Sequence, residues 1–246
     1  MARVFFAKDF IKKKSVNNLI FICDHASNYI PKKFKQLGIT KKELNSHIAY
    51  DIGAKTLTLE LAKKLNQSYF LSNFSRLLID PNRGKTDRDL IIKKSFETKI
   101  PGNLNISPEE RKKRIKFFYN LYHENLACFV KEKIKIFESV YLISIHSFTK
   151  ESLGINRGVE VGLLWNKNMN LLLPIQKILI KKKIHFGRNF PYSGFHFNHT
   201  LDKLNKTFSL DNITIEIRND LICHEKGIKK YVDLFSNIFK DILNDH

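Results

Sequence analysis

Cysteine, glycine and proline are all scarce in this chain of 246 residues. Its three cysteines, Cys23, Cys128 and Cys223, form neither an even set nor a C-x-x-C pair. This argues against a disulfide framework and is typical of a reducing compartment. Ten glycines and six prolines beside 43% hydrophobic residues argue against a disordered chain. We expect residues 1–246 to form a single domain with a substantial core, in a cytoplasmic protein.

Long hydrophobic runs are also missing. No stretch approaches the roughly 18 apolar residues that indicate a transmembrane helix. The opening segment MARVFFAKDFIKKK contains too short an apolar stretch for a signal peptide. The sequence therefore predicts no membrane partner and no secretory leader.

Acidic residues are few relative to basic ones. The chain has 24 Asp and Glu against 43 Lys and Arg, which gives a net charge of +19. Such an excess can indicate nucleic-acid binding. The lysines are scattered rather than gathered in one arm, and isoleucine and asparagine are also abundant, as an AT-rich genome would produce. We favour a compositional bias, and a basic nucleic-acid-binding protein is the alternative from another functional class.

Strand-like and helix-like segments alternate along the chain. Apolar runs predict strands at residues 18–23, 68–72, 76–80, 140–145, 159–165 and 212–217. Helical spacing and start signals predict helices at residues 41–65, 108–137, 168–182 and 225–243. Ser107 would cap the second helix, and Pro174 would kink the third or delay its start. The alternation predicts an α/β fold, with helices on both faces of a mostly parallel or mixed sheet.

Four of the predicted strands lead to or carry polar side chains. The residues are Asp24 and His25, then Asp80, Asn82 and Arg83, then His146 and Ser147, and finally Glu216 and Arg218. In open α/β sheets, ligands bind at the carboxyl edge of the strands. A single ending of this kind could be a solvated loop, but four of them indicate a site assembled along one edge.

The residue types at these endings suit a metal-dependent hydrolase. His25 and His146 offer neutral imidazoles, which bind Zn²⁺. The carboxylate of Glu216 can take a proton from water and pass it to a leaving amine. Arg76 and Arg83 can hold a carboxylate and polarise a carbonyl. The alternative is structural, with a hydrogen-bonded core histidine at position 146 and surface arginines at positions 76 and 83.

Seven motifs also follow one another in the order of a known family. They are CDHASNYIP, HIAYDIGA, SRLLIDPNR, ISIHSFT, EVGLLWN, NFPYSG and TIEIRNDLI, and they span about residues 21–222. In these motifs the chain resembles the N-formylglutamate amidohydrolase family, which is distantly similar to zinc carboxypeptidases and aspartoacylases. The resemblance implies a three-layer α/β/α sandwich like that of the zinc exopeptidases, and one divalent metal ion, Zn²⁺. It also implies hydrolysis of N-formyl-L-glutamate to formate and glutamate, the last step of one route of histidine degradation. The alternative substrate for the same site is another small N-acyl amino acid.

The resemblance also implies roles for individual residues. Glu216 and Arg76 would be catalytic, and His25 and His146 would bind the metal. Substrate contacts are expected from Asn82, Arg83, Tyr192, Ser193 and Arg218.

Two positions depart from the family pattern. Asn28 stands where a second metal-binding acid is expected, and asparagine is a poor zinc ligand. Asp51 is our substitute, because it lies four residues after His47 and would share one helix face with it. Asp51 would bind the metal directly or orient a ligating histidine, and Asp24 is a further candidate. Leu204 stands where many relatives have histidine, which bears on fine substrate specificity.

Overall fold

A mixed sheet forms the centre of the structure, a computed structural model that describes residues 3–9, 16–152 and 154–244. Seven strands within these residues lie in the order β1-β3-β2-β6-β11-β9-β10. Their bounds are β1 Phe5–Lys8, β2 Asn17–Cys23, β3 Ser68–Ser72, β6 Ser139–Phe148, β9 Val161–Leu164, β10 Phe186–Arg188 and β11 Asn212–Arg218. Strands β3, β2, β6 and β11 run parallel, whereas β1 and β9 run antiparallel to β3 and β11. The carboxyl ends of the four parallel strands therefore meet at one edge of the sheet.

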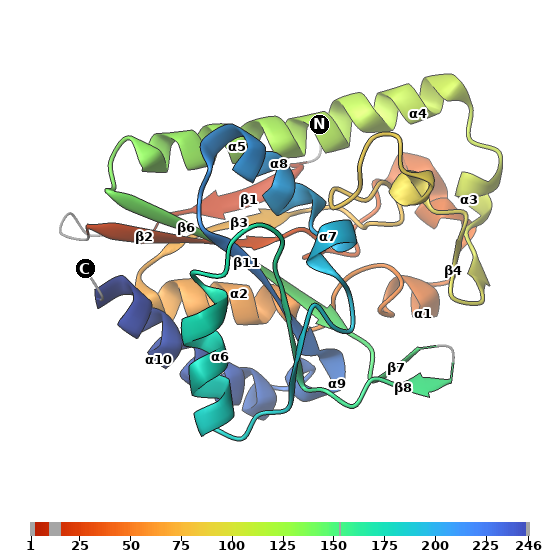
Figure 1. Cartoon of the computed structure of the whole chain (residues 1–246). Coiled ribbons are helices and arrows are strands. Elements are labelled where there is room, and N and C mark those ends of the chain that lie inside the picture. The colour runs from red at the N-terminus through yellow and green to blue at the C-terminus, as the bar shows by residue number, and fades with distance from the viewer. Residues whose placement is uncertain (1–2, 10–15, 153, 245–246) are drawn as a thin grey trace.

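Helices cover both faces of this sheet (Figure 1). Their bounds are α1 Lys41–Leu44, α2 Ala54–Leu65, α3 Pro101–Leu104, α4 Pro108–Arg114, α5 Leu121–Ile134, α6 Leu172–Lys181, α7 Gly194–Phe197, α8 His199–Phe208, α9 Asn219–Ile222 and α10 Glu225–Asn244. Helices α2, α6 and α10 cover one face, and the long rod of α4 and α5 covers the other together with α8. The predicted three-layer α/β/α sandwich around a mixed sheet is confirmed.

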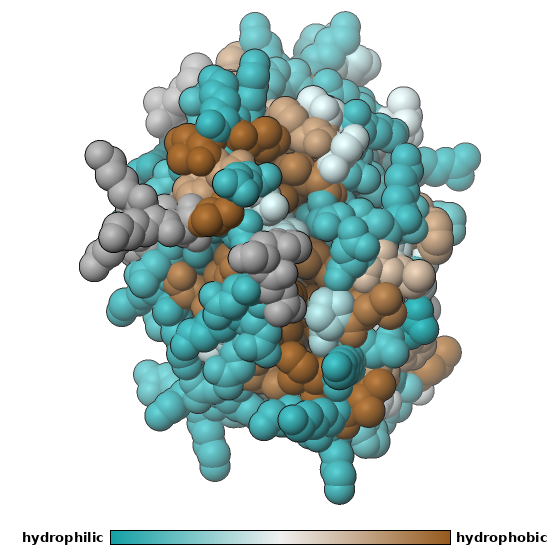
Figure 2. All heavy atoms as spheres, turned by 60° about the vertical axis from the view of Figure 1, so that its left-hand side comes forward, coloured by the Kyte–Doolittle hydropathy of each residue, from teal (hydrophilic) through white to brown (hydrophobic). Residues whose placement is uncertain are grey.

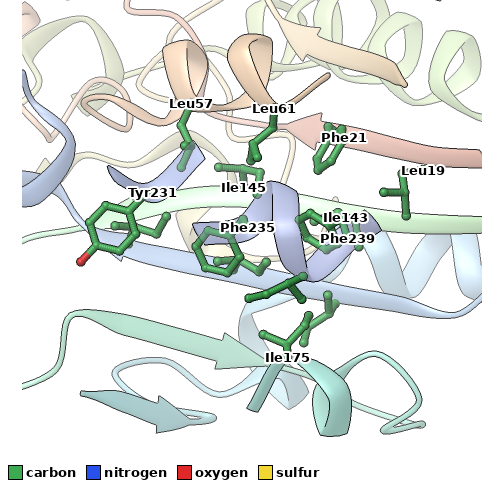
Figure 3. Close-up of a cluster of buried hydrophobic side chains, with 14 of the residues drawn as sticks. Leu19, Phe21, Leu57, Leu61, Ile143, Ile145, Ile175, Tyr231, Phe235 and Phe239 are labelled. Carbon is green, nitrogen blue, oxygen red and sulfur yellow. The ribbon is translucent and has the colours of Figure 1, made fainter. Parts of the chain in front are cut away.

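Strand β2 shows how the sequence supports this layering, because all of its residues are buried. Leu19 and Phe21 pack on the α2 and α10 side, where the rings of Phe21 and Phe239 meet edge to face at 5.4 Å (Figure 3). Ile20 and Ile22 alternate with them and pack against the other layer. Each such side chain stabilises the fold by roughly 1.5–3 kcal/mol on burial. A continuous apolar run is thus the signature of a strand that is covered on both faces.

The helix predicted over residues 41–65 is wrong in its first half. The chain forms α1, turns through residues 45–53, and only then begins α2. Gly53 precedes α2 with a φ of 82°, and a Cβ atom there would lie 2.2 Å from the carbonyl oxygen of Ile222. This left-handed backbone cannot continue a helix. Asp51 consequently lies in an irregular turn and does not share a helix face with His47.

The strand predicted at residues 76–80 is also wrong. Leu77 and Leu78 are buried, but they belong to a turn in which the Leu78 N–H donates to the Ser75 carbonyl. Side chains satisfy the buried carbonyls, since Asn103 Nδ2 donates to Leu77 O and Arg114 Nη1 to Leu78 O. An apolar run can therefore be a buried loop when distant side chains supply its hydrogen bonds.

The other predicted strands and helices are present in the structure but, apart from β3, their first or last residues differ from those predicted. Helices α4 and α5 join through a π-helical stretch, Ile115–Asn120, and the Ser107 hydroxyl accepts from Glu110 N–H as the predicted cap. Helix α6 begins at Leu172, which leaves Pro174 in its first turn and confirms the delayed start. The sequence patterns do not predict β1, β10 or α8.

Two short hairpins lie outside the main sheet. Strands β4 (Lys94–Ser95) and β5 (Thr98–Lys99) form one, and β7 (Glu151–Ser152) and β8 (Ile155–Asn156) form the other. None of the helices in the described part of the chain combines the length and the apolar character that a membrane-spanning helix needs.

Candidate active site

The polar strand ends meet in a small pocket at the carboxyl edge of β2, β6 and β11. The pocket encloses about 120 Å³. Its lining residues are His25, His47, Asp51, Arg76, Asp80, Asn82, Arg83, His146, Ser147, Tyr192, Phe197 and Glu216. Ionisable side chains gathered in a hollow at this edge of a sheet are a typical feature of an active site.

A group of three buried side chains lies at the floor of this pocket. His146 Nδ1 lies 2.8 Å from Asp51 Oδ2, and His25 Nδ1 lies 3.4 Å from the same oxygen. One ligand atom from each of these residues lies within 4.8 Å of the others, and the two imidazole rings are 4.9 Å apart. The group can therefore hold a metal ion.

The opposite nitrogen of each imidazole faces a second carboxylate. His25 Nε2 lies 2.8 Å from Asp80 Oδ1, and His146 Nε2 lies 3.3 Å from Asp24 Oδ2. Burial alone would lower the pKa of each imidazole, but the carboxylates outweigh burial and raise the pKa of both. A carboxylate behind a histidine is the usual arrangement around a metal-bound imidazole, since it fixes the ring and its tautomer.

Asp24 faces Nε2 of His146, whereas Asp51 faces Nδ1 of the same ring. Asp24 therefore lies outside the group formed by His25, Asp51 and His146. Its Oδ1 accepts from the hydroxyls of Tyr122 and Thr200 at 2.8 and 2.9 Å. Burial opposes ionisation of Asp24, yet the contact with His146 lowers its pKa below the ordinary value. Asn28, the other alternative, does not line the pocket, because its amide donates to Asn45 Oδ1 at 2.8 Å.

Glu216 brings a buried carboxyl group to the same pocket. Only 7% of the residue is exposed, and its Oε2 has no hydrogen-bond partner among the residues that the structure describes. Burial, opposed mainly by the charge of His146, raises the pKa of Glu216 to about 7. A carboxyl group with this pKa can both accept and donate a proton near neutrality.

Arg76 is held by backbone carbonyl groups and by the side chains at the floor of the pocket. Its Nε donates to Ile48 O at 3.1 Å, and its Nη2 donates to His47 O. Its Nη1 lies 3.0 Å from Asp51 Oδ1 and 3.3 Å from His25 Nδ1. The guanidinium therefore lies directly beside the histidine–aspartate group.

Arg83 and Asn82 lie on a tightly held loop. Arg83 is only loosely paired with Asp80, at 3.9 Å, and its guanidinium lies over the Phe197 ring at 4.8 Å. The Asn82 amide donates to Phe197 O at 3.1 Å and accepts from Thr200 N–H at 3.0 Å. Asn82 thus ties the loop to the segment before α8, whereas the loosely paired Arg83 lines the pocket.

The structure does not bring all of the expected substrate residues to the pocket. Tyr192 lines it, but Ser193 does not, because its hydroxyl caps α7 by accepting from Phe195 N–H at 3.3 Å. Arg218 also lies outside the lining and forms a bidentate pair with Asp220, at 2.7 and 3.2 Å. Both side chains already have partners.

Sequence reasoning gave no separate role to two lining residues, His47 and Phe197. His47 is part of the HIAYDIGA motif, which is the signal that could have identified it. Burial, strengthened by the charge of Arg76, lowers the pKa of His47 to about 3. Phe197 belongs to the unpredicted segment before α8, and no sequence pattern indicates it.

Comparisons with known proteins bear on the fold and the family of this chain. A gene product of Agrobacterium tumefaciens has a solved structure with a TM-score of 0.92 and 29% identity, covering 99% of this chain and 96% of the other. The N-formylglutamate amidohydrolase of Ralstonia eutropha JMP134 gives a TM-score of 0.72 at 17% identity, covering 98% and 97%, and so shares the fold. A search of curated proteins found no match. The model of the N-formylglutamate amidohydrolase family matches residues 17–223, and the chain therefore belongs to that family.

Proposed function

We propose that this chain is a zinc-dependent enzyme that hydrolyses N-formyl-L-glutamate to formate and glutamate. The observation that carries the proposal is the convergence of His25, His146 and Asp51 beside the buried carboxyl of Glu216. Family membership supports a hydrolase of amide C–N bonds. The small volume of the pocket, about 120 Å³, suits a small N-acyl amino acid.

The side chains at the floor of the pocket fit zinc. Two imidazole nitrogens and one carboxylate oxygen are a typical donor set of a catalytic zinc, with a fourth position left for water. Asp80 and Asp24 would hold the two rings in the tautomer that presents Nδ1 to the ion. Zinc held there would supply a Lewis acid and lower the pKa of a bound water to about 7.

Glu216 would move the proton that the reaction requires. Its carboxylate accepts a proton from the attacking water and delivers it to the nitrogen of the leaving amine. The water oxygen bonds to the formyl carbon, the C–N bond breaks, and the products are formate and free glutamate. The pKa of about 7 gives Glu216 access to both protonation states during this cycle.

The arginines would orient the substrate. Arg83 would bind the α-carboxylate, since its guanidinium is anchored over Phe197 and only loosely paired. Asn82 would position this loop, because its amide is bonded to Phe197 and Thr200. Arg76, adjacent to Asp51, would direct one N–H toward the formyl oxygen. Ser193 and Arg218 have no place in this arrangement.

One competing interpretation carries less support. The family match favours a hydrolase over a nucleic-acid-binding protein. On the face presented in Figure 2, hydrophilic side chains are spread widely with hydrophobic patches between them.

The cytoplasmic location, the single-domain organisation and the role in histidine degradation stay predictions from the sequence and the resemblance.

The test combines metal analysis with a substrate panel. We expect the purified protein to bind one equivalent of zinc and to release formate from N-formylglutamate. N-acetylglutamate and N-succinylglutamate should react more slowly, because their acyl groups need more room beside the metal. Faster hydrolysis of either would assign the site to that substrate instead. Metal-loaded protein that cleaves none of the three would contradict the proposal.

A further inference from the structure

A row of alternating arginine and aromatic side chains borders the pocket. Arg83 lies over the Phe197 ring at 4.8 Å, and the rings of Phe197 and Tyr192 are 5.4 Å apart. The guanidinium of Arg157 lies over the other ring, Tyr192, also at 4.8 Å. Both rings line the pocket. Arg83 lines the pocket as well, whereas Arg157 is not a lining residue and borders the pocket through its contact with Tyr192.

Arg157 differs from the other arginines here because, among the described residues, its charge has no ion-pair partner. Arg76 is paired with Asp51, and Arg218 with Asp220. Over the described part of the chain, Arg157 forms no ion pair; its Nη1 donates to the Thr149 carbonyl at 3.3 Å, and its side chain also forms a hydrogen bond with Tyr192. It is half-buried against aromatic rings. A partly desolvated guanidinium without a counter-ion is a suitable partner for an anionic ligand.

The backbone around Arg157 is fixed on both sides. Its N–H donates to Lys150 O at 3.0 Å, one step beyond the β7–β8 hairpin, and its carbonyl accepts from Val159 N–H at 2.7 Å. Gly158 follows with a φ of 63°, and its N–H donates to Asn156 Oδ1 at 2.9 Å. Because these bonds fix the backbone that carries the guanidinium, binding of a ligand would cost less ordering entropy than it would on a flexible loop.

The charge of Arg157 also acts on the pocket. Burial raises the pKa of Tyr192, and Arg157 opposes that rise. The pKa of His47 is lowered mainly by burial and by Arg76, and Arg157 contributes to the same shift. Tyr192 and His47 both line the pocket, so the guanidinium lies close enough to affect a bound anion.

We infer that Arg157 binds the side-chain carboxylate of the substrate, while Arg83 binds the α-carboxylate. Arg157 is then the residue that distinguishes an acidic side chain from a neutral one of equal size. The inference rests on the proposed function, because it assigns the second carboxylate of N-formylglutamate. Phe197 and Tyr192 would keep the two cations apart, which suits a ligand with two separate carboxylates.

The test compares N-formylglutamate with N-formylglutamine, which has the same shape but lacks the side-chain charge. The wild type should prefer the acid in kcat/KM. Arg157→Gln should lower kcat/KM for the acid roughly tenfold to a hundredfold, because it removes a hydrogen-bonded charge contact, and should change the amide less than about threefold. The kcat/KM of Arg157→Lys for the acid should lie between those of the wild type and Arg157→Gln, since lysine keeps the charge without the planar fork. Arg188→Gln is the matched control, because Arg188 also packs over an aromatic ring, at 5.4 Å, but that ring, Trp165, does not line the pocket as Tyr192 does.

A binding measurement separates this inference from the proposed function. L-glutamate and L-glutamine are titrated calorimetrically into zinc-loaded wild type and Arg157→Gln. The substitution should weaken glutamate binding and leave glutamine binding unchanged, whether or not hydrolysis is detected. Equal losses of affinity for both ligands would show that Arg157 only supports the packing of the pocket. No loss of affinity for either ligand would show that Arg157 does not contact them. Each of these two results would overturn the inference. Absence of hydrolysis of every N-formyl substrate by the wild type would contradict the proposed function alone.

Discussion

Glu216 and His146 are direct neighbours in the sheet, as register partners of the parallel strands β11 and β6. Side chains at paired positions point to the same face of a sheet. Both residues accordingly reach the same pocket. Strand pairing rather than a loop fixes the carboxyl relative to the imidazole, so a substitution that preserves shape should leave the arrangement intact.

Glu216→Gln should keep the fold and the metal but lower kcat by roughly two to four orders of magnitude. Glutamine has the shape of glutamate but cannot take and return a proton. KM should change little. Steady-state formate release and zinc content are measured together, with Glu160→Gln as control, because Glu160 is an acid bonded to Tyr231 outside the pocket. A kcat near that of wild type with full zinc would assign the proton transfer to another residue.

Asp24→Asn should weaken zinc binding by roughly tenfold to a hundredfold. Asparagine keeps an oxygen for the hydroxyls of Tyr122 and Thr200, but it removes the negative charge behind His146. Competition with a chelator measures the affinity. Asp202→Asn is the control, since Asp202 is bonded to Asn166 away from the pocket. Unchanged affinity in Asp24→Asn would show that this carboxylate does not orient the ring of His146.

The buried His123 should make stability fall as the pH falls below about 6.5. Burial, with a smaller contribution from Lys203, lowers the pKa of His123 to about 3. The unfolded chain takes up this proton near pH 6.5, whereas the folded chain does not until about pH 3. The unfolded state therefore binds more protons between these values, and the free energy of unfolding decreases as the pH is lowered.

Replacing this side chain isolates its contribution. The difference in unfolding free energy between pH 7 and pH 5 should be up to about 2 kcal/mol smaller in His123→Gln than in wild type. Urea denaturation at the two pH values measures it. His185→Gln removes an exposed imidazole instead and serves as the control. An identical pH dependence in wild type and His123→Gln would contradict the assignment.

Gly53→Ala should destabilise the protein more than Gly154→Ala. Both glycines have a positive φ, 82° and 77°, so both substitutions strain the backbone. Only at Gly53 would the new Cβ lie 2.2 Å from a backbone oxygen, that of Ile222, whereas nothing lies within 4 Å at Gly154. We expect a loss of about 1 kcal/mol for Gly154→Ala and roughly 3 kcal/mol or more for Gly53→Ala. Thermal denaturation measures both variants, and equal decreases in melting temperature would show that the end of α9 moves away freely from the new side chain.

The sequence by itself determined the centre of the fold. Strands β2, β6 and β11 are covered on both faces, so each appears as an apolar run whose polar end marks the carboxyl edge. That local pattern was sufficient to predict that His25, His146 and Glu216 would approach one another.

Only the tertiary structure decided the rest, because contacts between distant segments control it. The helix predicted from residue 41 is interrupted where Arg76 binds the carbonyl of Ile48 and Ser75 binds that of Ala49. The same turn brings Asp51 to the histidines, a position that neither spacing nor helical periodicity could give. The side-chain partner of Arg218 and the packing of Arg157 over the rings of Tyr192 and Phe148 are likewise decided by the tertiary structure. Local sequence sets which groups can ionise, and long-range packing decides which of them face one another.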